Sequence, residues 1–156
     1  MCITYHSYPY GITTGNNAIL SMSNYKSCCF YFSFVFLTNG LFALWKRKYT
    51  YSLAFYSLTL TSVVVHGIYF STVTVIIDKI AICSIVILGL FYLLRCPSRV
   101  IIYTFVTFVT VTWIYYYGYM TNQFCFDSNK MVADLCNSTI HILSSIGHHL
   151  IIASTY

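Results

Sequence analysis

The sequence predicts an all-α protein, a multi-pass bundle of about five transmembrane helices. The first observation is composition: 58% of residues are hydrophobic, 7% are charged, and the mean hydropathy is +0.73, which lies outside the range of soluble domains. The second is that the apolar runs approach the roughly 20 residues needed to cross a bilayer core. The third is their continuity, which favours helices over the alternating strands of a membrane barrel.

The elements follow from the apolar runs and the polar stretches between them. Residues 1–25 carry no early basic region and no continuous apolar core, so they predict a short polar tail rather than a cleavable signal peptide. Residues 26–156 then form the helical bundle, with expected spans at residues 28–45, 52–73, 76–94, 100–118 and 138–155. The connections between them are "KRKYT", a bend near residues 73–76, "RCPSR" and "MTNQFCFDSNKMVAD".

The basic residues predict an orientation. Five of the eight Lys and Arg residues lie in the first and third connections: Lys46, Arg47, Lys48, Arg95 and Arg99. Lys79, just after the bend, is the one basic residue at the second connection, and Lys130 is the one at the fourth. The positive-inside rule therefore places the first and third connections in the cytoplasm. The N-terminus is then non-cytoplasmic and the C-terminus cytoplasmic. This spread along the chain matches membrane topology better than a nucleic-acid-binding patch.

Four of the seven cysteines are expected near the non-cytoplasmic face: Cys28, Cys29, Cys125 and Cys136. No two of the seven have the CxxC spacing of a zinc ribbon. Because a non-cytoplasmic compartment permits oxidation, a disulfide from Cys125 to Cys28 or Cys29 is one hypothesis. Packing as small apolar side chains inside the helices is the other.

Three polar residues lie within the stretch "SVVVHGIYFSTVTVIIDK". Ser62 and His66 are four residues apart and therefore share one face of a helix. Asp78 is the one acidic residue in a predicted span, and an ionisable group there costs a few kcal/mol unless it faces the interior with a partner. The alternative is that Asp78 pairs with Lys79 or caps the third helix at the interface.

The last predicted helix brings a second polar group to the same depth. Asn137 and His141 are four residues apart at its beginning, and antiparallel packing returns them to the level of His66 and Asp78. Imidazoles beside a carboxylate indicate a zinc site, which typically has three protein ligands and a water. His148 lies about 10 Å further along the helix, too far to share one metal ion with His141 easily. His148 and His149 either line a deeper part of the cavity or pack in the cytoplasmic half, and we favour packing.

The polar segments together resemble a known family. "SVVVH", "IIDKIAI" and "FCFDSNKMVADLCNSTIHILSSIG" are similar to motifs of the CREST superfamily of membrane hydrolases, which includes the alkaline ceramidases and the progestin and adipoQ receptors. The resemblance implies that His66 and His141 are zinc ligands, that Asp78 holds the zinc-bound water and that Ser62 supports the site. Asn137 occupies the place of a third histidine.

The resemblance further implies the kind of reaction. A zinc-dependent hydrolase of this type cleaves an amide or ester bond of a membrane lipid, as ceramidases do. Members commonly have seven spans, so five predict a reduced form. The acidic N-terminal segment that binds calcium in alkaline ceramidases has no counterpart, because no Asp or Glu precedes Asp78.

A second hypothesis is a non-enzymatic membrane protein, such as a small channel or an interaction subunit. In that case His66, Asp78 and the other histidines form a polar relay or hold helices together. A serine nucleophile is disfavoured, because Ser62 and His66 lie on one helix and no strained nucleophile turn is present.

Overall fold

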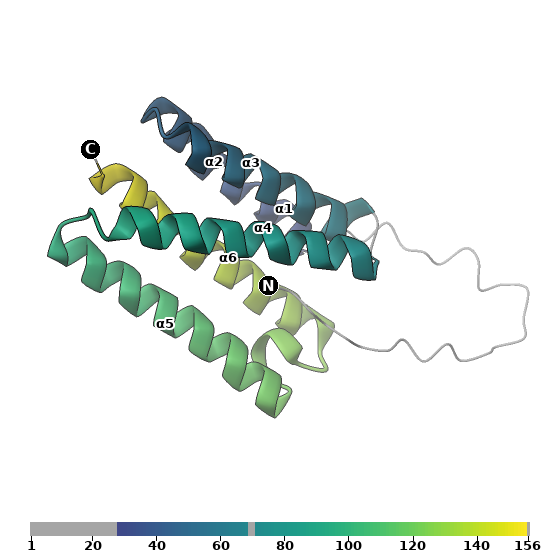
Figure 1. The fold of residues 1–156 in the computed structure, drawn as a ribbon. Helices are drawn as coiled ribbons and strands as arrows, with labels where there is room; N and C mark the ends of the chain where they lie inside the picture. The colour runs from purple at the N-terminus through teal and green to yellow at the C-terminus, as the bar shows by residue number, and fades with distance from the viewer. Residues whose placement is uncertain (1–27, 69–70, 156) are drawn as a thin grey trace, which may run out of the picture.

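The computed structural model describes residues 28–68 and 71–155, so the predicted tail at residues 1–25 lies outside it. The described part of the chain is helical and contains no strand (Figure 1). Its elements are α1 (Cys28–Ser33), α2 (Val35–Trp45), α3 (Tyr49–Val63), the π-helical turn η2 (Val64–Ile68), α4 (Thr72–Leu93), α5 (Ser98–Thr121), the 3₁₀ turn η3 (Phe124–Phe126) and α6 (Lys130–Ser154).

Helices occupy each of the five predicted regions. Three of the described helical segments are long and apolar enough to cross a membrane: Cys28–Trp45, which α1 and α2 share, α4 and α5. The other two helices, α3 and α6, do not meet this criterion, for separate reasons. α3 has 15 residues before it passes into the π-turn, and α6 has 25 residues but carries many polar side chains.

The bend expected near residues 73–76 lies earlier, before α4. Ser71 is the N-cap: its hydroxyl accepts from the Thr74 amide at 3.1 Å, and the Thr74 hydroxyl accepts from the Ser71 amide at 2.9 Å. This reciprocal capping box satisfies two amides that a helix start leaves exposed. Asp78 therefore lies about 9 Å along α4 rather than at its beginning.

The helix that contains the expected span at residues 138–155 begins earlier, because α6 starts at Lys130, inside the stretch expected to be a connection. The side chain of Asn129 caps it by accepting from the Met131 amide at 3.0 Å. The polar residues of "KMVADLC" resemble a loop in hydropathy, yet Ala133 is buried among them. Asn137 therefore lies two helical turns inside α6.

Helix α6 is the centre of the bundle. It packs against α1, α2, α4 and α5, and Figure 1 shows it passing behind α4. Its buried face is rich in small and polar residues: Ala133, Asn137, Ser138, His141, Ser145 and Gly147. Asn39 of α2 donates to the Ser145 carbonyl at 3.1 Å and to its hydroxyl at 2.8 Å. Small side chains let neighbouring helices approach closely, and polar ones bond across the contact.

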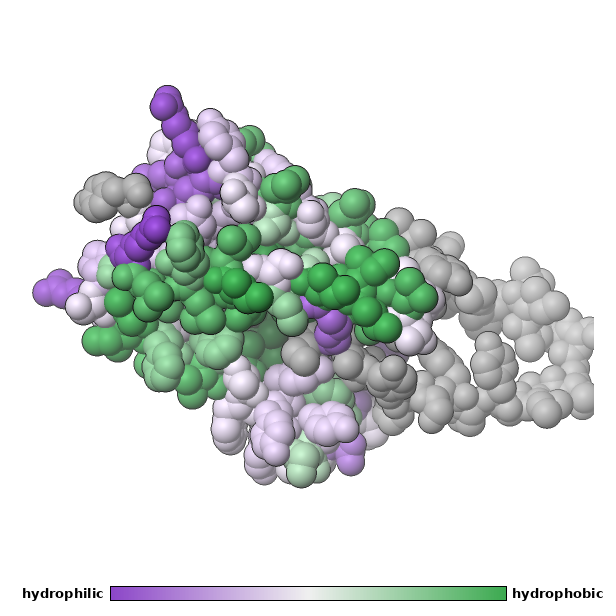
Figure 2. All heavy atoms as spheres, in the orientation of Figure 1, coloured by the Kyte–Doolittle hydropathy of each residue, from purple (hydrophilic) through white to green (hydrophobic). Residues whose placement is uncertain are grey.

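Helix α5 lies at the edge of the bundle. It packs on α6 and on η3, and Thr104 and Gly118 are its buried residues. Apolar and aromatic side chains cover most of its remaining surface, as they do on the outer side of α4. Figure 2 shows hydrophobic side chains gathered over α4 in this view. Such surfaces suit a lipid environment better than water.

The basic connections gather at one end of the bundle. The α2–α3 and α4–α5 connections and the end of α6 lie together on the left of Figure 1, where Figure 2 shows hydrophilic side chains. Lys48 in the first connection donates to the Thr155 carbonyl at 2.9 Å and lies 5.2 Å from the Tyr92 ring centroid. Burial lowers the pKa of the Lys48 ammonium. Lys48 thus fastens the end of α6 to α3.

The half of the bundle near this basic end is held by two histidines of α6. Tyr51 of α3 hydrogen-bonds His148 through its hydroxyl, and His149 stacks on Phe42 with centroids 4.2 Å apart. His149 also lies 3.2 Å from the Asn39 amide oxygen. Both histidines thus lie near the basic end and make packing contacts there, as the favoured interpretation expects.

Gly89 on α4 is essential to this packing, because an added Cβ would lie 2.9 Å from His148 Cε1 and 3.2 Å from the Tyr51 hydroxyl. We expect Gly89→Ala to destabilise the protein by about 1–3 kcal/mol through overpacking. Thermal unfolding in detergent measures the loss. Gly147→Ala on α6 is the matched control, since its Cβ would meet Thr107 at an ordinary 3.7 Å. Equal unfolding midpoints for the two variants would contradict the close packing at Gly89.

Candidate functional site

The polar layer near the other end of the bundle begins with a contact between α3 and α4. The Ser62 hydroxyl donates to Asp78 Oδ1 at 2.7 Å, and the Thr61 hydroxyl donates to the same oxygen at 2.9 Å. Asp78 is 5% exposed. Two hydroxyl donors offset part of the cost of burying this carboxyl group. The sequence indicated Ser62 and Asp78, whereas Thr61 was missed because it faces Asp78 only after α3 and α4 pack.

The alternative in which Asp78 caps its helix is wrong, because Ser71 holds that position. Lys79, the next residue, extends toward α5, where its ammonium lies 6.0 Å from the Tyr115 ring centroid. The two neighbouring charges of α4 therefore contact different helices.

His66 lies in the π-turn η2, which continues α3. Such turns widen the helix locally and occur often at functional sites. Gly67 in the same turn allows the Phe30 ring of α1 to come close, since a Cβ there would lie 2.1 Å from Phe30 Cδ2. This π-turn was not predicted, because hydropathy does not distinguish a π-helical turn from an α-helical one.

His141 of α6 meets His66 inside the bundle. Their ring centroids lie 6.0 Å apart, and the Phe36 ring of α2 contacts His141 from a centroid distance of 5.1 Å. His141 is 4% exposed, whereas His66 is half-buried. Two imidazoles separated by 75 residues in the sequence thus become neighbours. The second and last helical regions were expected to lie side by side at this depth, and they do so where His66 meets His141.

Asn137 lies one turn before His141 and is buried. Its amide nitrogen donates to the Cys125 carbonyl of η3 at 3.5 Å, a long hydrogen bond. The structure therefore gives Asn137 a contact with the α5–α6 turn.

The layer contains two neighbouring imidazoles, His66 and His141. Zinc takes three or four ligands at about 2.0–2.3 Å. Among residues 28–68 and 71–155, no three His, Cys, Asp or Glu side chains are grouped closely enough to hold a metal ion. Asn137, one turn before His141, adds a carboxamide to the same helix.

The predicted cysteines fall into two separate contacts. The Cys125 thiol lies 3.2 Å from the Cys136 thiol, across the α5–α6 turn. Cys29 instead lies near the start of α6, with its sulfur 3.8 Å from the Ser138 hydroxyl. The hypothesis of a bridge from Cys125 to Cys28 or Cys29 did not consider Cys136, which is the thiol that the fold places beside Cys125.

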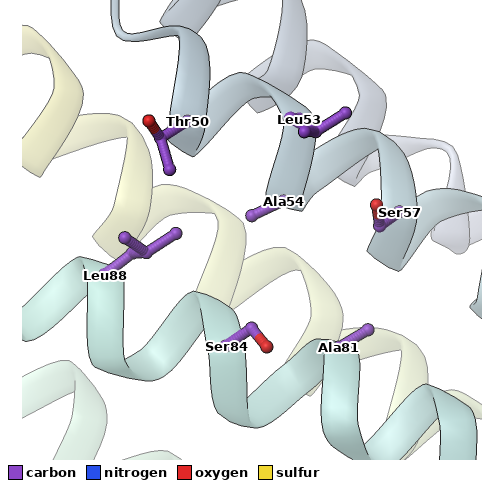
Figure 3. Close-up of a pocket in the computed structure, with 7 residues that line it drawn as sticks. All are labelled: Thr50, Leu53, Ala54, Ser57, Ala81, Ser84 and Leu88. Carbon is purple, nitrogen blue, oxygen red and sulfur yellow. The ribbon is translucent and has the colours of Figure 1, made fainter.

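A shallow groove of about 250 Å³ lies between α3 and α4 (Figure 3). Seven residues line it: Thr50, Leu53, Ala54, Ser57, Ala81, Ser84 and Leu88. Neither histidine nor Asp78 lines this groove, so it is separate from the polar layer.

No known protein family, curated protein or solved structure shows a significant match to this chain.

We expect Ser62→Ala to weaken the α3–α4 contact by about 1.5–3 kcal/mol, because the mutation removes one of the two hydroxyls that donate to the buried Asp78. Thermal unfolding in detergent provides the measurement. The matched control is Ser84→Ala on α4, where an exposed hydroxyl bonds the Ile80 carbonyl of its own helix at 2.9 Å.

A double-mutant cycle with Asp78→Leu separates the hydrogen bond from a general loss of packing. The Ser62→Ala loss should shrink in the Asp78→Leu background, because leucine has a similar size but no oxygen to accept the hydrogen bond. An equal loss in both backgrounds would show that Ser62 contributes through packing instead.

Proposed function

We propose that the chain crosses a membrane five times, with α6 as the inner span. Three helical segments have the length and hydropathy for this. α3 and η2 together approach the roughly 30 Å of a bilayer core, and α6 extends about 37 Å. The polar face of α6 packs against α1, α2, α4 and α5, which shield it from lipid. A polar helix is tolerated at such a position because its side chains face protein.

The proposed orientation places the basic end in the cytoplasm. Lys46, Arg47, Lys48, Arg95 and Arg99 belong to the two connections at this end, and the positive-inside rule favours its retention there. The polar layer then lies in the non-cytoplasmic half of the membrane.

We further propose that this layer is a reduced form of the CREST lipid hydrolase site, with zinc as its metal ion and a membrane lipid amide or ester as its substrate. The observation that supports the proposal most directly is the meeting of His66 and His141, with Ser62, which donates to Asp78, four residues before His66. Three chain segments contribute to it, and they contain the residue types that the resemblance implies except for the third histidine, whose place Asn137 takes.

In this proposal, Asn137 in place of the third histidine weakens zinc binding and therefore lowers the hydrolytic activity of the site. A carboxamide is a weaker zinc ligand than an imidazole, and the Asn137 nitrogen already donates to Cys125. We therefore expect weak zinc binding and low hydrolytic activity in the natural chain. The third imidazole is the missing part.

Restoring that imidazole tests the proposal. Asn137→His should raise the zinc content of the purified protein toward one ion per chain, because three histidines would then converge. The gain should disappear in the double variants that also carry His66→Ala or His141→Ala. His149→Ala is the matched control, since this histidine packs on Phe42 near the basic end and should leave the zinc content unchanged.

Metal analysis by mass spectrometry after dialysis gives the readout. Equal zinc contents in Asn137→His and the wild-type chain would overturn the metal site, provided that both variants unfold at similar temperatures.

A second function, a non-enzymatic polar core that joins helices, is favoured by one observation. Asn137 bonds the α5–α6 turn, as a structural residue does. The two functions differ in one measurement, which is hydrolysis of a ceramide and of a lipid ester in mixed micelles by the Asn137→His variant. Release of fatty acid that depends on zinc and on Asp78 supports the hydrolase. Zinc uptake without any release would favour the non-enzymatic core.

A further inference from the structure

We propose that Cys125 and Cys136 form a redox-sensitive disulfide that closes the α5–α6 turn onto α6. The two sulfur atoms lie 3.2 Å apart. A disulfide bond is about 2.05 Å long, so little movement of the two side chains is needed. The proposed orientation matters to this proposal in one respect: it places the two thiols on the non-cytoplasmic side, where an oxidant is available in cells.

The local fold places both thiols for this role. α5 has 24 residues and extends about 36 Å, which exceeds the bilayer core, so η3 and Cys125 lie near its surface. Asn122 ends α5 in the left-handed conformation, and the chain then turns back so that η3 packs against α6. The bond would therefore cross-link a contact that the fold already forms.

The two thiols differ in how far they are exposed to an oxidant, and this difference indicates which of them reacts first. Cys125 is 2% exposed, whereas Cys136 is half-buried. Cys136 is the thiol that an external oxidant meets first, and Cys125 is the resolving thiol behind it. A buried partner within reach distinguishes this pair from the outward-facing Cys83 on α4.

The reaction balances with a glutathione or protein disulfide as oxidant. The Cys136 thiolate attacks one sulfur of that disulfide, forming a mixed disulfide and releasing one thiol. The Cys125 thiolate then attacks the Cys136 sulfur, which forms the Cys125–Cys136 bond and releases the second thiol. The two protons of the protein thiols end on the two released thiols, and the incoming disulfide is reduced.

The bond would also fix the candidate site. Asn137 follows Cys136 directly and donates to the carbonyl of Cys125. Oxidation therefore holds the residue at the third-ligand position against η3, one helical turn from His141. In the reduced protein this contact depends on one long hydrogen bond and on packing.

The test oxidises the purified full-length protein in detergent with oxidised glutathione, blocks remaining thiols and identifies linked peptides by mass spectrometry. We expect a peptide pair joined through Cys125 and Cys136, together with a higher unfolding temperature than in the reduced protein. The pair should be lost in Cys136→Ser and retained in Cys83→Ser and in the double variant Cys28→Ser with Cys29→Ser. Absence of this pair in the folded wild-type protein, or Cys125 linked to Cys28 or Cys29 instead, would overturn the proposal.

A parallel measurement separates the disulfide from the proposed orientation. Cells are lysed in a membrane-permeant alkylating reagent, so that the thiols keep the state they had in the membrane. Finding the linked pair supports both proposals. Finding both thiols alkylated, when the purified protein forms the pair readily, would contradict the orientation and leave the disulfide supported.

Discussion

The structure depends on one constraint: polar side chains within a largely apolar bundle must find their partners inside it. Helix α6 carries more of the buried polar side chains than any other described helix, and its neighbours supply several of the partners. Asn39 bonds Ser145, Tyr51 bonds His148, and η3 receives Asn137. In the proposed membrane setting no water replaces a lost partner, so each contact also fixes the rotation of a helix about its axis.

These contacts divide the interior into two layers with different properties. Near the basic end, the rings of Tyr51 and Phe55 contact His148, His149 stacks on Phe42, and an added Cβ at Gly89 would crowd His148. Toward the other end lie the Ser62–Asp78 contact, the neighbouring rings of His66 and His141, the π-turn and the contact of Asn137 with η3. The first layer suits stability. The second combines irregular backbone with ionisable groups, a combination typical of functional sites.

The comparison between prediction and structure shows which errors hydropathy produces. Hydropathy located the helical regions to within a few residues, because a run of about 20 apolar residues is typical of a membrane-spanning helix. The first turns of α6 were expected to be a connection, because they are polar and Ala133 is their one buried residue before Asn137. Likewise, the spacing of Ser62 and His66 indicated a shared face. The hydroxyl of Thr61 and the ring of Phe36 join the layer only through contacts between helices.

By itself, the sequence determined the helical class, the five helical regions and the residues with the chemistry of a site. Composition and local spacing are sufficient for these properties, because they depend on neighbours along one helix. The tertiary structure decided which residues meet: His66 with His141, Cys125 with Cys136, and Asn137 with the α5–α6 turn. Those pairings depend on how each helix is rotated and shifted against α6. That geometry comes from side-chain packing across the whole bundle, which no single segment encodes.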